Sequence, residues 1–266
     1  MVLVFGGTTE GKHVISLLNE MQLPFVYSTK TKIDVELGEL GKYRNGALTS
    51  EALIKLIQEE NIERIIHAAH PFAKELHVTI DEATQVEKIE VLRLERSYSK
   101  RLENELVIYF DDYTDLLVAL HKDFQGKNLL ALTGVQSIEK LKTFWANNMS
   151  YFRILDRDSS IDISEKSNFP REQLILEKPE NLIGGEQVLI DQFNIDVIIT
   201  KESGNTGALE SKIELALKSE IRILILTKPT LPKSFIQLQS REELKAVLNS
   251  NSSLKTQNSS FKILKV

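Results

Sequence analysis

A short apolar run that ends in a glycine turn is the first feature of the chain with a chemical consequence. Residues 2–5 are apolar, Gly6 and Gly7 follow, and Thr8 or Thr9 can cap the helix predicted next. Because glycine has no Cβ, such a turn lets a pyrophosphate approach the N–H groups at a helix start. The run lacks the full G-x-G-x-x-G fingerprint, so it is typical of either a nucleotide site or a plain strand-to-helix turn.

A histidine follows the predicted strand at 64–68, in the run Ala-His-Pro-Phe-Ala at 69–73. Pro71 suits the first turn of a helix, where its missing N–H costs nothing, so His70 is expected at the mouth of a site. Such a histidine is either a turn residue that bonds to the backbone or a functional residue of the site.

Charged residues end the next predicted strand, 90–94, in the run Arg93-Leu94-Glu95-Arg96. Strand alternation directs Arg93 and Glu95 to one face of the sheet and Arg96 to the other. This pattern is typical of a solvated ion-pair patch or of a site that binds carboxylates.

In the second half of the chain, polar turns again follow apolar runs and lead into predicted helices. Thr133 and Gly134 follow an apolar run and open a helix, and a polar turn at 201–207 precedes the helix that bears Lys212. Lysine beside helix-start N–H groups suits an anion.

Composition narrows the class of protein. The chain has 266 residues, of which 42% are hydrophobic and 27% charged, so one large or two small globular domains are expected. It has no cysteine and no apolar stretch long enough to span a bilayer, which favours a cytoplasmic protein without thiolate chemistry. A net charge of −5 disfavours nucleic acid as the main partner. We expect no metal and a monomer or weak homo-oligomer.

Apolar runs alternate with helical patterns, which predicts an α/β fold with mostly parallel sheets. Ten strands are expected, at 2–5, 25–28, 64–68, 90–94, 106–109, 128–132, 151–155, 173–176, 196–200 and 222–226. We therefore predict two Rossmann-like domains with a ligand cleft between them: a dinucleotide-binding domain at 1–98 and a substrate domain at 99–235. Residues 236–266 are expected to form a helix at 241–248 and a mobile polar tail of unknown role.

In this order and spacing, the motifs resemble the precorrin-6A reductases, a family that includes the cobalt-precorrin-6A reductases. The resemblance covers about residues 1–230 and rests on Gly-Gly-Thr-Thr-Glu at 6–10, His-Pro-Phe-Ala at 70–73, Leu-Arg-Leu-Glu-Arg at 92–96, Thr-Gly at 133–134, Arg153, Lys-Glu-Ser-Gly at 201–204 and Lys212. It implies NAD(P)H-dependent reduction of a carbon–carbon double bond of precorrin-6A or cobalt-precorrin-6A to the corresponding 6B compound, in cobalamin biosynthesis. The chain departs from many relatives at Val135, often arginine, and at Glu202, often asparagine.

The end of the predicted strand 25–28 bears on the choice of cofactor. NAD-specific sites usually offer an acidic residue there, whereas this chain has Ser-Thr-Lys-Thr-Lys at 28–32. Hydroxyls and lysines would suit a 2′-phosphate and favour NADPH over NADH, although Lys30 and Lys32 are equally typical of a solvated surface.

The site residues follow from the motifs and the resemblance together. His70 is the candidate donor of the proton that accompanies the hydride, and solvent is the alternative. We expect the cofactor to contact Gly6, Gly7, Thr8, Thr9, Glu10, Ser28, Lys30, His70, Pro71, Phe72, Thr133 and Gly134. A corrin precursor carries a rim of carboxylates, and we expect it to contact Arg93, Glu95, Arg96, Arg153, Lys201, Ser203, Gly204 and Lys212. The alternatives are a reductase of another small acidic substrate and a non-catalytic nucleotide-binding protein.

Overall fold

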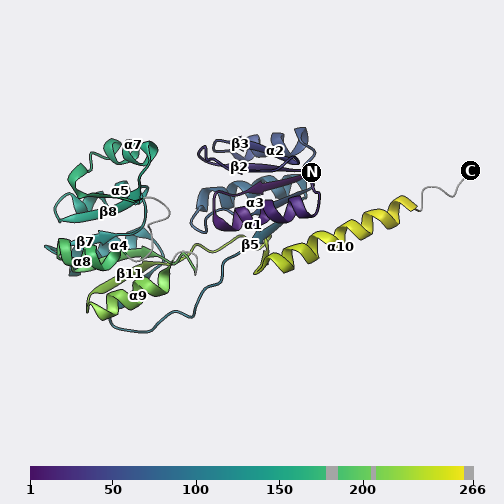
Figure 1. Ribbon diagram of the computed structural model, residues 1–266. Coiled ribbons are helices and arrows are strands. Elements are labelled where there is room, and N and C mark those ends of the chain that lie inside the picture. The colour runs from purple at the N-terminus through teal and green to yellow at the C-terminus, as the bar shows by residue number, and fades with distance from the viewer. Residues whose placement is uncertain (178–184, 205–207, 261–266) are drawn as a thin grey trace, which may run out of the picture. The chain divides into compact units, whose positions relative to one another are not determined.

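The computed structural model describes residues 1–177, 185–204 and 208–260, and the side chains to residue 250 (Figure 1). The chain divides into two compact units: Met1–Ser97 with the chain from Pro229 onward, and Tyr98–Lys228. The chain first crosses from one unit to the other after Ser97, one residue before the end of the predicted domain 1–98. The return to the first unit at Pro229 differs from the prediction, which ended the second domain at residue 235 and left the tail separate.

The first unit is built on a six-stranded parallel sheet with the order β12-β5-β4-β1-β2-β3. Its strands are β1 (Val2–Phe5), β2 (Phe25–Thr29), β3 (Gly41–Asn45), β4 (Arg64–His67), β5 (Glu90–Leu94) and β12 (Ile236–Leu238). With β12 in the sixth place, this is the Rossmann order, in which the direction of winding reverses between β1 and β4. Ligands of such sheets bind at the carboxyl ends of the strands beside this switch point.

Helices cover both faces of the first sheet: α1 (Thr9–Glu20), α2 (Ser50–Glu59), α3 (Lys74–Glu87) and α10 (Arg241–Ser260). On one face, Val4 and Ile66 pack in a core cluster that contains apolar residues of α1 and α10. On the other face, Leu3 and Ile65 pack in a cluster that contains residues of α2 and α3. Neighbouring residues of one strand thus serve opposite cores, so the buried strands read as continuous apolar runs.

The second unit repeats the design with a six-stranded parallel sheet of order β6-β11-β10-β7-β8-β9. Its strands are β6 (Val107–Phe110), β7 (Leu129–Ala131), β8 (Ser150–Leu155), β9 (Leu174–Glu177), β10 (Val197–Lys201) and β11 (Arg222–Leu226). Its helices are α4 (Tyr113–Asp123), α5 (Ser137–Lys140), α6 (Lys142–Trp145), α7 (Asp158–Lys166), α8 (Glu186–Phe193) and α9 (Leu209–Lys218), with a 3₁₀ turn at Arg171–Gln173. The switch point lies between β7 and β10.

In each sheet, one of the two edge strands comes directly after the chain has crossed from one unit to the other. β6 follows the first crossing and pairs with β11, and β12 follows the second crossing and pairs with β5. In the first sheet, the N–H of Glu95 continues this pairing by donating to the carbonyl of Leu238 at 2.8 Å. The C-terminal segment is therefore part of the first unit, and it lies against the strand that ends in the Arg-Leu-Glu-Arg motif.

The predicted fold class is confirmed, and all ten predicted strands are present. Two strands were missed, β3 and β12, because β3 has the mostly polar sequence Gly-Lys-Tyr-Arg-Asn and β12 has only three residues. The last helix begins at Arg241 as predicted but continues to Ser260, through a segment predicted to be mobile.

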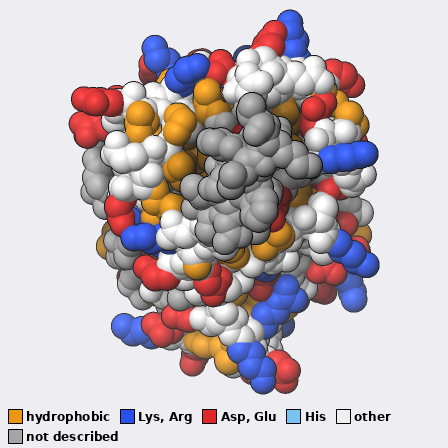
Figure 2. Space-filling model, turned by 90° about the vertical axis from the view of Figure 1, so that its right-hand side faces the viewer, with side chains coloured by type: hydrophobic (Ala, Val, Ile, Leu, Met, Phe, Trp, Pro, Cys, Tyr) orange, Lys and Arg blue, Asp and Glu red, His pale blue; other side chains and the backbone are white. Residues whose placement is uncertain are grey.

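Charged side chains of both signs are interspersed over the face shown in Figure 2. Among the described residues, no helix is both long and apolar enough to cross a membrane. In the same residues, no group of three or more His, Asp and Glu side chains is arranged to hold a metal ion.

Candidate functional site

The glycine turn after β1 is closed by a tyrosine from the neighbouring strand β2. The N–H of Gly7 donates to Tyr27 Oη at 2.8 Å, and a Cβ at Gly6 would overlap the same phenol. Gly7 also has φ +93°, which favours glycine. Tyr27 is fully buried, and burial raises its pKa, so the phenol stays protonated. The turn itself therefore requires both glycines, and the N–H of Gly7 is bound by the phenol.

Thr8 caps α1, one of the two caps predicted. Its Oγ1 accepts the N–H of Gly11 at 3.1 Å and donates to the carbonyl of Ala68 at 2.6 Å. Ala68 directly follows β4, so one hydroxyl joins the ends of the two strands that flank the switch point. This bond fixes the start of α1 where a Rossmann fold places the pyrophosphate.

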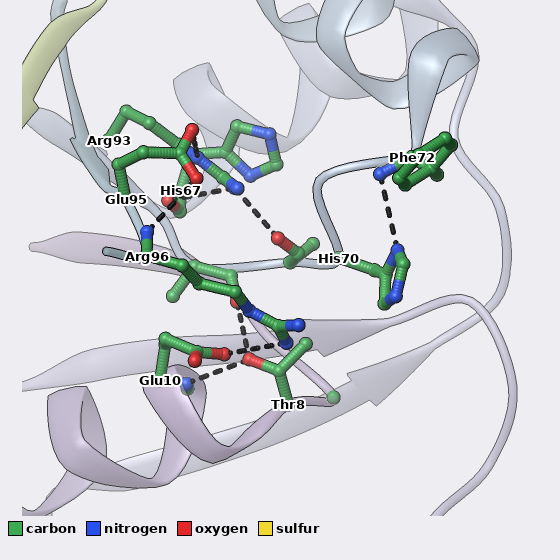
Figure 3. A network of polar contacts seen from close by, with 12 residues as sticks. Thr8, Glu10, His67, His70, Phe72, Arg93, Glu95 and Arg96 are labelled. Carbon is green, nitrogen blue, oxygen red and sulfur yellow. Dashed lines mark hydrogen bonds and ion pairs between the residues drawn. The ribbon is translucent and has the colours of Figure 1, made fainter. Parts of the chain in front are cut away.

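A buried network of charges extends from the end of β5 to the start of α1 (Figure 3). Arg93 is 1% exposed; its Nη1 donates to the carbonyl of Ala69 at 2.7 Å, and its Nε lies 3.4 Å from Glu95 Oε2. The backbone N–H of Arg96 donates to Glu95 Oε1 at 3.0 Å. The side chain of Arg96 then pairs with Glu10, with 3.0 Å between Nη2 and Oε2.

The cluster is thus not a solvated patch, because its ion pairs are internal and shielded from water. Burial alone would raise the pKa of Glu10, but the charge of Arg96 and hydrogen bonds to the carboxylate outweigh it and lower the pKa. Glu10 is therefore ionised at neutral pH and balances Arg96.

Two buried histidines lie behind this network. His67 at the end of β4 is 0% exposed, and its ring centroid lies 5.0 Å from that of His77 on α3. Their ring nitrogens have no hydrogen-bond partner within the described residues. Burial, followed by the charge of Arg93, lowers the pKa of both: well below 6.5 for His67 and to about 4 for His77. Both histidines are therefore neutral at physiological pH.

His70 lies in an exposed turn, and its own backbone closes that turn. Its Nδ1 accepts the N–H of Phe72 at 3.2 Å, and its carbonyl accepts the N–H of Ala73 at 3.0 Å (Figure 3). Because α3 begins at Lys74, Pro71 belongs to this turn and not to the first turn of the helix, where the sequence placed it. An accepting Nδ1 implies that the proton of the neutral ring is on Nε2.

Hydroxyls and an arginine stand on the other side of the glycine turn, at the ends of β2 and β3. Arg44 Nη1 donates to Ser28 Oγ at 2.6 Å, and Thr29 Oγ1 lies 2.7 Å from Tyr43 Oη. Lys30, which the sequence favoured as a cofactor contact, is exposed and lies 3.7 Å from Glu75. No carboxylate follows β2 directly.

At the switch point of the second unit, the predicted motifs Thr-Gly at 133–134 and Lys-Glu-Ser-Gly at 201–204 are hydrogen-bonded to each other. Lys201 Nζ at the end of β10 donates to the carbonyl of Thr133, after β7, at 2.6 Å. Thr133 Oγ1 lies 2.6 Å from Ser137 Oγ, and Gly134 has φ +78°. Burial, and then the charge of Lys140, lowers the pKa of Lys201 to about 8, so the amine is still mostly protonated at pH 7.

A second buried cluster holds Arg153 and Lys212. Arg153 Nη1 lies 2.9 Å from Glu186 Oε1 and 3.5 Å from Glu177 Oε2. Burial and then the charge of Arg153 lower the pKa of Lys212, and Glu186 opposes them, so that the pKa is about 8. The two basic residues thus share one electrostatic environment.

Glu202 binds residues from the start and from the end of the segment that forms the second unit. Its carboxylate binds Arg101 through two bonds of 2.8 and 2.9 Å and accepts the N–H of Lys228 at 2.9 Å. Ser203 is buried, Gly204 has φ +71°, and the remaining residues of the polar turn, 205–207, lie outside the described residues. A pocket of this unit opens beside this carboxylate and is lined by Tyr98, Ser99, Lys100, Arg101, Leu102, Tyr109, Glu202, Gly204, Leu209, Glu210, Ile213 and Glu214.

Comparison with known proteins gives one consistent family. The sequence profile described as "Precorrin-6x reductase CbiJ/CobK" matches residues 1–249. A cobalt-precorrin-6A reductase of Methanocaldococcus jannaschii is 25% identical over 232 residues, covering 86% of this chain and 90% of the relative. A precorrin-6A reductase of Rhodococcus erythropolis is 24% identical over 237 residues, covering 87% of this chain and 90% of the relative.

Among solved structures, "CobK precorrin-6A reductase" superposes with a TM-score of 0.76 at 18% identity, covering 94% of this chain and 96% of that one. At this identity the likeness shows a shared fold.

Proposed function

The chain belongs to the precorrin-6x reductase family, and we propose that its first unit binds NADPH at the switch point between β1 and β4. The family reduces precorrin-6A or cobalt-precorrin-6A in cobalamin biosynthesis, so the chain is an oxidoreductase with a nicotinamide cofactor and a tetrapyrrole substrate. Cytoplasmic location, and a monomer or weak homo-oligomer, stay predictions from the sequence.

The residues around the glycine turn fit a dinucleotide. The turn leads into the capped start of α1 beside the switch point, where the first N–H groups of the helix can receive a pyrophosphate. Thr29 and Lys30 stand where an NAD-specific site would offer a carboxylate to the ribose hydroxyls, which favours NADPH over NADH. The single observation that carries the proposal is this turn at the switch point of a Rossmann-ordered sheet.

When bound, the nicotinamide cofactor supplies a hydride to one carbon of the double bond, and a proton must reach the other. The protein's contribution is to hold and orient both molecules. We propose His70 as the proton donor, because its exposed side chain lies in the loop that follows β4, at the carboxyl ends of the strands. It would donate as the imidazolium and return to the neutral ring, the form whose Nδ1 accepts the N–H of Phe72. Arg93 donates to the carbonyl of Ala69 beside it, so we propose that Arg93 positions this loop instead of binding substrate.

For the carboxylates of the substrate, we propose Arg96 in the first unit and Lys201 and Lys212 in the second. Each is a cation at or near the carboxyl ends of a parallel sheet, and charge-assisted pairs are the strong hydrogen bonds in a desolvated site. Arg153 is engaged by Glu177 and Glu186, so we propose that it positions Lys212 electrostatically. Glu95, Ser203 and Gly204 stay predicted neighbours of the substrate.

Turnover with purified substrates tests the proposal. Cobalt-precorrin-6A and its metal-free counterpart are each incubated with the enzyme and NADPH under anaerobic conditions, and NADPH consumption is followed by absorbance. We expect consumption with at least one of the two, and the preferred one identifies the metal state of the substrate. If neither substrate causes NADPH or NADH to be consumed, the proposed activity is wrong.

A further inference from the structure

Arg44 is joined to the glycine turn through a single serine. In the register of the sheet, Arg44 on β3 lies opposite Ser28 on β2, and its Nη1 donates to Ser28 Oγ at 2.6 Å. The carbonyl of Ser28 in turn accepts the N–H of Gly6 at 3.0 Å. The guanidinium therefore lies at the carboxyl ends of the strands on the β2–β3 side of the switch point, which in a Rossmann sheet receives the adenosine half of the cofactor.

Among the described residues, the partners of the Arg44 guanidinium are all neutral. It donates to the Ser28 hydroxyl and to the carbonyls of Asn45 at 3.3 Å and Gly46 at 3.1 Å. Burial lowers the pKa of Arg44, and within the described residues no carboxylate lies at ion-pair distance from it. A half-buried guanidinium without an anion is unusual, because desolvation of a charge is costly unless a counter-charge compensates it.

The other arginines of the first unit behave differently. Each has a carboxylate partner: Arg64 with Glu90, Arg93 with Glu95, Arg96 with Glu10, and Arg241 with Glu20. Arg44 is thus held in place without being neutralised. A guanidinium has five N–H donors, and the three bonds from Arg44 leave two for a ligand.

We propose that Arg44, oriented by Ser28, binds the 2′-phosphate of NADPH and sets the preference for NADPH over NADH. The inference rests on the proposed function, in which the first unit binds a nicotinamide dinucleotide. It replaces the lysines favoured by the sequence, because Lys30 is exposed and faces Glu75, whereas the fork of an oriented arginine matches a phosphate.

Calorimetric titration of wild type and Arg44→Ala with adenosine 2′,5′-bisphosphate and with 5′-AMP tests the proposal without turnover. The two nucleotides differ in the 2′-phosphate. We expect Arg44→Ala to weaken the bisphosphate about 10- to 100-fold, the range for a lost hydrogen bond to a charged group, and 5′-AMP less than about 3-fold. Lys42→Ala on the same strand is the matched control, and Lys30→Ala tests the competing prediction; both should bind like wild type.

Several outcomes would overturn the proposal. Equal weakening of both nucleotides would make Arg44 a general part of the adenosine pocket, and an unchanged Arg44→Ala with a weakened Lys30→Ala would restore the lysine. If wild type binds NADPH but Arg44→Ala retains the preference, this inference alone fails. If wild type binds none of these nucleotides, nor NADPH or NADH, the cofactor proposal fails with it. Should Arg44→Ala not fold, Arg44→Lys serves instead, with a smaller loss expected for the bisphosphate only.

Discussion

Acidification is predicted to destabilise the first unit through its buried histidine pair. In the folded chain the pKa of His77 is lowered from 6.5 to about 4, chiefly by burial and then by the charge of Arg93. The unfolded chain therefore binds the proton more readily, and stability falls as the pH decreases from about 6.5 towards 4. His67 is fully buried, and its lowered pKa acts in the same direction.

The size of the effect follows from the two pKa values. At pH 5, unfolded His77 is almost entirely protonated, while the folded side chain is mostly neutral. Linkage then gives a loss of about 2 kcal/mol in the free energy of unfolding between roughly pH 7 and pH 5 from His77 alone. This is a large share of the stability of an ordinary domain.

Urea unfolding of wild type and His77→Phe at both pH values measures the loss. The variant removes this titration but keeps an aromatic ring beside His67, so subtracting its pH dependence cancels the contribution of the carboxylates. Wild type should lose about 2 kcal/mol more than the variant. Equal losses would refute the reasoning, because they would mean that His77 titrates in the folded state as it does in the unfolded chain.

Three further predictions concern the turn and the second unit. Gly6→Ala should lower the free energy of unfolding by about 3 kcal/mol, because its Cβ overlaps Tyr27; urea unfolding of the variant measures this, and a loss below about 1 kcal/mol would contradict the geometry. Arg153→Met should cost about 3–5 kcal/mol, because it removes the guanidinium that pairs with the buried carboxylate of Glu186. Arg153→Met with Glu186→Leu should recover most of the stability in the same assay. Lys201→Met should weaken substrate binding by about 2 kcal/mol or more without changing NADPH affinity. The substrate affinity of wild type should fall as the pH rises through about 8, because Lys201 then loses its charge. Calorimetric titrations with substrate that show neither change would exclude Lys201 from the substrate site.

The fold was largely readable from the sequence because buried parallel strands are continuous apolar runs. β5 and β11, for example, match their predicted bounds. β3 escaped detection because an edge strand with a polar sequence has no such pattern, and β12 because its place in the first sheet depends on a partner more than a hundred residues earlier. For the same reason, the sequence did not reveal the return of the chain to the first unit at Pro229.

The candidate site was readable where the chemistry is local in sequence. The glycine turn and the Thr8 cap follow from neighbouring residues, and alternation brings Arg93 and Glu95 together. Tyr27 and Arg44 were missed because their roles come from the pairing of strands, which no local pattern reveals. Once β3 is known, its register with β2 brings Arg44 to Ser28 directly.

Transfer of deuterium from NADPH to the tetrapyrrole tests the central claim most directly. NADPH labelled at the transferable position of the nicotinamide ring is incubated with the enzyme and cobalt-precorrin-6A or its metal-free counterpart, and the product is analysed by mass spectrometry. Hydride transfer from a bound nicotinamide predicts that the label appears on carbon in the reduced product. A reduced product without the label, or bound substrate that is never reduced, would contradict the account.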